Sequence, residues 1–181
     1  MPSYLNPGTP YKIVMTGPES SGKTSLGQAL AKQLDGLFVP EFARYYLNAL
    51  GAPYSESDFV RIACGQAAWE IFGQKQGNTH LILDTDWTVL HIWQSIRFPN
   101  RTENLWEEAY SAIPLPHLYI LCAPDFPWQP DPLREHPDSR EALFSSYKQL
   151  LDQKGLNYLT VSGSESERLK QVLHFLHKQL P

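Results

Sequence analysis

Eight consecutive residues constrain the fold of this chain more than any other part of its sequence. Residues 17–24 read Gly-Pro-Glu-Ser-Ser-Gly-Lys-Thr and match the pattern Gly-x-x-x-x-Gly-Lys-[Ser/Thr]. The apolar run before them, residues 12–16, predicts a buried strand, and leucines spaced four residues apart predict a helix over residues 23–34. A strand, a glycine turn and a helix in this order are the structural context of a phosphate-binding loop.

The residue types in this loop suit a nucleoside triphosphate. Glycines let backbone N–H groups approach a phosphate closely, the helix N-terminus adds partial positive charge, and Lys23 can reach the β and γ oxygens. Thr24 is the residue expected to hold a magnesium ion. We therefore predict ATP and Mg²⁺ as cofactors, although no motif separates ATP from GTP. The residues expected to contact the nucleotide are Gly17, Glu19, Ser20, Ser21, Gly22, Lys23, Thr24 and Ser25.

The rest of the chain alternates short apolar runs with helical patterns. Further strands are predicted at residues 37–40, 80–83, 117–122 and 158–161. Helices are predicted at residues 55–74, 88–97, 103–113, 139–153 and 164–179. The strands are too apolar to have a wetted face, which favours an α/β fold in three layers, with a five-stranded parallel sheet between helices. No linker or repeat divides the chain, so residues 1–181 are expected to form a single domain.

Several candidate side chains follow the predicted strands, where ligands of parallel sheets bind. Asp84 ends the third strand and is the candidate magnesium ligand, together with Thr24. Asp86 could contact magnesium or a substrate hydroxyl, or could only cap the next helix. Glu41 follows the second strand and could accept the proton of an attacking hydroxyl, with Arg44 steadying the acceptor, although the two could equally form a surface pair.

A proline-rich segment interrupts the pattern. Residues 124–138 hold five of the fifteen prolines, which excludes a continuous helix and predicts a mobile lid reaching to about residue 140. Arg134 and Arg140 are candidates to close over the triphosphate, or are ordinary solvated arginines. Gln66 could hydrogen-bond an acceptor, although a place in the helical core explains it as well.

Composition narrows the class of protein. The 15 basic and 19 acidic residues give a net charge of −4 without a polybasic run, which argues against nucleic acid as a partner. No segment has the length and apolar character of a signal peptide or a membrane span, so a cytoplasmic protein is expected. Cys64 and Cys122 lack metal-ligand spacing and are predicted to be reduced, mostly buried thiols.

Several of these motifs together resemble the ATPase/kinase domain of NadR-type proteins, which has ribosylnicotinamide kinase activity. The resemblance rests on residues 17–24, 40–44, 65–66, 83–86, 132–134 with Arg140, and 161–163. It implies a P-loop fold similar to nucleoside and nucleotide kinases, with an acceptor pocket between the second helix and the lid. It also implies ATP with magnesium as the phosphoryl donor, but does not by itself fix the acceptor. We predict nicotinamide riboside as the acceptor, with Glu41, Arg44, Gln66 and Asp86 as the residues expected to bind it.

Two other functions fit the same motifs. A nucleotide-operated binding module would need the phosphate-binding loop but no general base beside a bound hydroxyl. A nucleoside monophosphate kinase would need additional arginines in the acceptor pocket, for which Arg44, Arg61 and Arg97 are available. The predicted catalytic set for the kinase is Lys23, Glu41, Asp84, Asp86, Arg134 and Arg140. The sequence indicates no oligomeric state.

Overall fold

A computed structural model describes residues 9–51, 53–100, 107–133 and 138–179. The strands are β1 (Tyr11–Thr16), β2 (Leu37–Val39), β3 (His80–Leu83), β4 (Leu118–Cys122) and β5 (Tyr158–Val161). The helices are α1 (Lys23–Gln33), α2 (Phe42–Leu50), α3 (Glu56–Gln74), α4 (Trp87–Arg97), α5 (Glu107–Ser111), α6 (Arg140–Gln153) and α7 (Glu165–Gln179).

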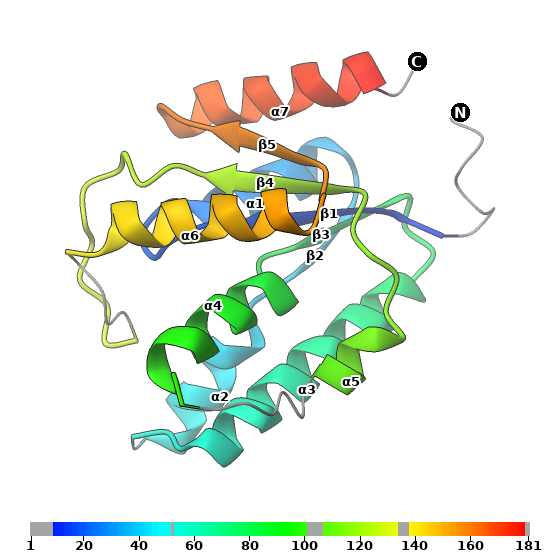
Figure 1. The fold of residues 1–181 in the computed structure, drawn as a ribbon. Helices are drawn as coiled ribbons and strands as arrows, with labels where there is room; N and C mark the ends of the chain where they lie inside the picture. The colour runs from blue at the N-terminus through cyan, green and yellow to red at the C-terminus, as the bar shows by residue number, and fades with distance from the viewer. Residues whose placement is uncertain (1–8, 52, 101–106, 134–137, 180–181) are drawn as a thin grey trace.

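All strand pairings in the five-stranded sheet are parallel, and the strand order is β2-β3-β1-β4-β5 (Figure 1). The predicted α/β sheet is therefore confirmed. β1 lies at the centre, with Ile13 opposite Ile82 of β3 and Leu118 of β4. Because parallel strands end at one edge, the loops after β1, β2 and β3 gather at the carboxyl edge of the sheet.

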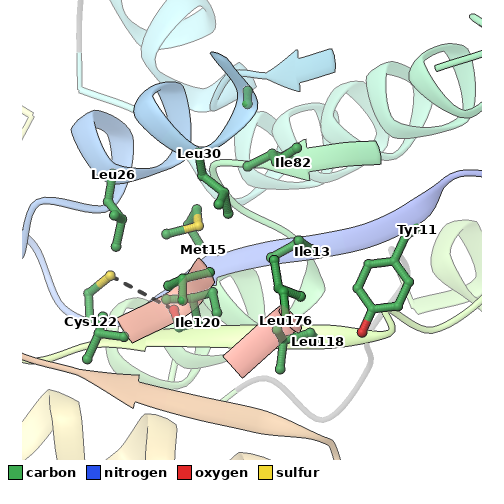
Figure 2. Close-up of a cluster of buried hydrophobic side chains, with 13 residues drawn as sticks. Tyr11, Ile13, Met15, Leu26, Leu30, Ile82, Leu118, Ile120, Cys122 and Leu176 are labelled. Atoms are coloured by element: carbon green, nitrogen blue, oxygen red, sulfur yellow. Dashed lines mark hydrogen bonds between the residues drawn. The ribbon is translucent and has the colours of Figure 1, made fainter. Parts of the chain in front are cut away.

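Helices cover both faces of the sheet. On one face, Leu26 and Leu30 of α1 and Val172 of α7 pack with Ile13 and Met15 of β1 (Figure 2). On the other face, Val14 of the same strand belongs to a cluster with residues of α4 and α6. The two faces of β1 are thus both buried, as the continuous apolar run predicted.

A third apolar cluster contains no strand residue. It is formed by α2, α3, α4 and α5, and includes Ala43, Phe59, Leu90 and Tyr110. These helices form an extension of the sheet: α2 and α4 follow the carboxyl ends of β2 and β3, and the end of α3 packs along the two strands, with Gly73 next to Leu37 and Leu81. Lys12 of β1 ties this extension to the sheet, because its buried ammonium pairs with Glu70 of α3 at 2.5 Å and also contacts the Pro114 carbonyl.

The predicted element boundaries need small changes. β2 ends at Val39 and not at Pro40, since a proline has no N–H for the ladder, and β4 begins one residue after His117. Ser55 and Asp58 form the predicted capping box of α3, with the Ser55 N–H donating to Asp58 Oδ2 at 2.9 Å. The helix predicted over residues 103–113 is described only from Glu107, since residues 101–106 lie outside the described ranges.

Two predictions were wrong. The sequence reading left out α2, which has a single buried residue, Ala43, and so lacks a strong buried stripe. Its end is marked by Gly51 in the left-handed conformation, with φ 62°. Cys64 is exposed, because it lies on the outer side of α3, while Cys122 of β4 is buried as predicted.

Candidate active site

The loop after β1 has the geometry that the glycine pattern predicted. Gly17 has φ 129°, and a Cβ there would lie 2.7 Å from the Cys122 carbonyl oxygen, so only glycine fits. Gly22, with φ 78°, stands at the N-cap of α1. The Lys23 ammonium donates to the Gly17 and Pro18 carbonyls at 2.9 and 2.7 Å, which holds this cation directly against the loop.

Arg168 of α7 supports the loop from beneath, and the sequence reading missed it. Its side chain is completely buried and donates to the carbonyl oxygens of Ser21 at 2.6 Å, Gly163 at 2.8 Å and Ala123 at 3.0 Å. It also pairs with Asp125 at the start of the proline-rich segment. One guanidinium therefore joins the phosphate-binding loop, the end of β4 and the turn after β5.

A sequence signal for Arg168 existed. Arg168, Val172 and Leu176 follow one another at spacings of four and are the buried residues of α7. An arginine in line with an apolar stripe is expected to be buried and fully hydrogen-bonded.

Arg140, one of the two predicted lid arginines, also connects the proline-rich segment to the phosphate-binding loop. It donates to the Phe126 carbonyl at 2.8 Å and to the Ser20 carbonyl at 3.5 Å, and its guanidinium lies 5.8 Å from the centre of the Trp128 ring. Arg140 is not one of the described residues that line the pocket beside this loop. Its contacts therefore connect the proline-rich segment to the phosphate-binding loop. Arg134 lies outside the described residues.

Thr24 and Asp84 meet as predicted. The Thr24 hydroxyl donates to Asp84 Oδ2 at 2.7 Å, while Asp84 Oδ1 is buried and has no hydrogen-bond partner in the described part of the chain. Burial raises the pKa of Asp84, against the opposing effects of Thr24 and Lys23. A hydroxyl beside a carboxylate with an unused oxygen is a donor set that fits Mg²⁺ or its bound water. No group of three or more His, Cys, Asp or Glu that could hold a metal occurs among the described residues.

Glu41 is the N-cap residue of α2 and lines the pocket beside the loop. Its pKa is raised, first by burial and then by the charge of Asp84, while Lys23 and Arg44 lower it. A carboxylate with a raised pKa is a better proton acceptor than an ordinary glutamate. Arg44 also lines the pocket, but it pairs with Asp131 of the proline-rich segment at 2.9 Å.

Asp86 and Gln66 have structural partners. Asp86 caps α4, accepting from the Thr88 N–H at 2.9 Å, and also accepts from the Tyr119 hydroxyl at 2.7 Å. Gln66 Oε1 accepts from the Phe42 N–H at 2.7 Å, which fixes the turn that carries Glu41. Neither side chain lines the pocket among the described residues. Their contacts match the capping and core alternatives, and any contact with a substrate stays a prediction.

The pocket has a volume of about 590 Å³ and extends well beyond the phosphate-binding loop. One end is formed by residues 17–26, with Phe126, Glu165 and Arg168 beside it. The other end is formed by Pro53, Tyr54, Trp93, Ile96 and Arg97, while Val89 packs against the cluster that contains Tyr147. Glu41 and Arg44 lie in the wall that also includes Ala43 and Leu47. This volume is in the range of small-molecule sites.

A parallel sheet with β1 at its centre, this loop, and the Thr24–Asp84 pair define the class of P-loop nucleoside triphosphatases with a nucleoside and nucleotide kinase-like fold. More narrowly, the chain belongs to a family described as "AAA domain", whose model matches residues 12–168. A search of curated proteins found no significant relative.

Solved structures with the same fold support the resemblance to NadR. NadR protein in complex with NAD and AMP-PNP is 21% identical, with a TM-score of 0.76, and the match covers 94% of this chain and 49% of that one. NadR protein in complex with NR gives 20% identity, the same TM-score, and 94% and 50% coverage. Thymidylate kinase from Candida albicans is 12% identical, with a TM-score of 0.69 and 94% and 92% coverage.

The chain thus spans about half the length of the NadR chains that it matches. At these identities the likeness concerns the fold. No helix in the described part of the chain has the length and apolar character needed to cross a membrane.

Proposed function

We propose that this protein is an ATP-dependent kinase that transfers the γ-phosphoryl group to the hydroxyl of a nucleoside-like acceptor, most specifically nicotinamide riboside. One observation carries the proposal: a single pocket runs from the phosphate-binding loop past Glu41 to an aromatic end. A nucleotide switch needs only the first part of such a pocket. A kinase needs all of it.

In this mechanism the loop amides and Lys23 bind the β and γ phosphates, and Thr24 and Asp84 hold Mg²⁺. When bound, Mg²⁺ neutralises charge on the phosphate oxygens. Glu41 accepts the proton of the acceptor hydroxyl as its oxygen forms a bond to the γ phosphorus. The bond from the γ phosphorus to the β–γ bridging oxygen breaks, and its electron pair leaves with ADP. Positioning and charge supply most of the catalysis.

The choice of acceptor rests on two further points. The fold is similar to that of NadR protein, which has been solved in complex with NR. The outer end of the pocket carries Tyr54 and Trp93, whose rings suit a flat heterocycle. A nucleoside monophosphate kinase is the second candidate: Arg44 and Arg97 line the pocket, but Arg44 pairs with Asp131, and Arg61 lies outside the pocket lining and pairs with Asp58.

The deciding experiment measures magnesium-dependent ATP consumption with and without nicotinamide riboside, and follows formation of the 5′-phosphate by mass spectrometry. We expect one ADP for each riboside phosphate formed. ATP binding without transfer to this or any other nucleoside or nucleoside monophosphate would contradict the kinase and favour the switch.

A further inference from the structure

The outer end of the pocket has a defined aromatic wall. The Trp93 indole N–H donates to the Tyr54 hydroxyl at 2.9 Å, and the two ring centres are 5.2 Å apart in an edge contact. Trp93 also makes an edge contact with Phe59, which is almost completely buried. The ring positions are therefore set before any ligand enters, and they present flat apolar surface.

A cation lies on this wall. The Arg97 guanidinium is 5.4 Å from the centre of the Tyr54 ring, and Arg97 lines the same pocket. An arginine in the last turn of α4 also interacts well with the helix dipole, but that effect requires no contact with Tyr54. The contact with the ring restricts the guanidinium, and a guanidinium held over a ring can still donate N–H hydrogen bonds.

The described charges along the pocket are unevenly distributed. Its carboxylates are Glu19 in the loop, Glu165 at the start of α7, and Glu41 where the reacting hydroxyl is proposed to lie. Arg97 is the charged residue among the described residues that form the outer end. Glu56 shares a second hollow with Arg97, but it does not line the larger pocket.

From this arrangement we infer that Tyr54, Trp93 and Arg97 form a subsite for a heterocyclic ring bearing a carboxylate, which the Arg97 guanidinium binds. This inference rests on the proposed kinase function and specifies its acceptor. Nicotinamide riboside, the acceptor proposed above, stays a substrate, but among pyridine ribosides we expect its acid counterpart, nicotinic acid riboside, to react faster. Both forms carry a cationic pyridinium ring, but only the acid form adds a carboxylate that can accept hydrogen bonds from the guanidinium.

The test compares nicotinic acid riboside with nicotinamide riboside, which differ only in this group. For the unchanged protein we expect kcat/KM to be about tenfold or more higher for the acid, as for a hydrogen bond to a charged group. Arg97→Gln should bring the ratio close to one by slowing the acid, and Arg97→Lys should restore part of it. Arg61→Gln is the matched control, since Arg61 lies on α3 outside the pocket lining, and it should keep the ratio.

A ratio that is the same in Arg97→Gln and the unchanged protein, or a preference for the amide, would overturn the subsite. Phosphorylation of neither riboside would instead refute the proposed acceptor class. In that case, calorimetric titration with both ribosides tests the subsite without turnover. Tighter binding of the acid that is lost in Arg97→Gln supports it, and equal or absent binding overturns it.

Discussion

The two ends of the pocket are built differently. The phosphate end sits on the central strand of the sheet and is held by a buried arginine that reaches three backbone carbonyls. The outer end is formed by the segment before α3 and by the second half of α4, where Ile96 is 40% exposed and Trp93 makes edge contacts with Tyr54 and Phe59. Many contacts fix the phosphate end, whereas a few replaceable side chains shape the outer end. In the proposed function, chemistry and specificity would therefore be separated in space.

The largest effect should come from the phosphate end. Lys23→Ala removes the cation that the loop carbonyls hold in place, and we expect turnover to fall on the order of a thousandfold, with weaker ATP binding. Steady-state kinetics and calorimetric titration with ATP would measure both. Near-normal turnover would show that the loop amides suffice and that the phosphate end is less dependent on side chains than proposed.

Glu41→Gln should impair phosphoryl transfer without impairing ATP binding at the phosphate end. The amide cannot accept a proton, so transfer should slow by roughly a hundredfold or more, while ATP affinity stays nearly unchanged. Rapid-quench measurement of the phosphorylated acceptor gives the transfer rate, and titration with ATP gives the ATP affinity. A normal transfer rate would exclude Glu41 as the base.

Arg168→Lys should affect the phosphate end alone. A single ammonium cannot replace four guanidinium contacts, so the loop should loosen and ATP affinity should fall about tenfold, as expected for lost charged hydrogen bonds. The acceptor KM at saturating ATP should hardly change. Lys170→Arg, on the exposed side of the same helix, is a suitable control. An equal change in the ATP affinity and the acceptor KM would mean that the two ends of the pocket are coupled.

The smallest expected effect is a shift in pH dependence. Glu41 has a raised pKa through burial and Asp84, and only its ionised form can accept the proton. The rate should therefore fall as the pH drops through this pKa, at a higher pH than an ordinary glutamate would give. A pH profile of kcat/KM measures it, and Glu41→Gln should lack this step. Because the pKa of Asp84 is also raised, magnesium-dependent ATP binding over the same range distinguishes the two carboxylates.

The sequence predicted the sheet and the phosphate end far better than the outer end. Five apolar runs predict β1 to β5, and one local motif predicts the phosphate-binding loop, because each of these features depends on residues that are neighbours in the sequence. Arg168 contacts Ser21 across 147 positions, a relation that no local pattern contains. Tyr54, Trp93 and Arg97 likewise meet only because the segment before α3 lies against α4. Asp86 had three predicted roles; the contacts show the helix cap, and contact with magnesium or a substrate stays a prediction.

Arg168 also bears on how far the protein can be shortened. A fragment ending after β5 would keep the glycine-rich motif, Glu41, Asp84 and all five strands, yet it would lose the guanidinium that holds the Ser21 carbonyl. Such a fragment would contain the recognisable motifs without the part that gives the first of them its shape. Supplying α7 as a separate peptide should then restore nucleotide binding, which would make this helix a point at which the protein can be split and reassembled.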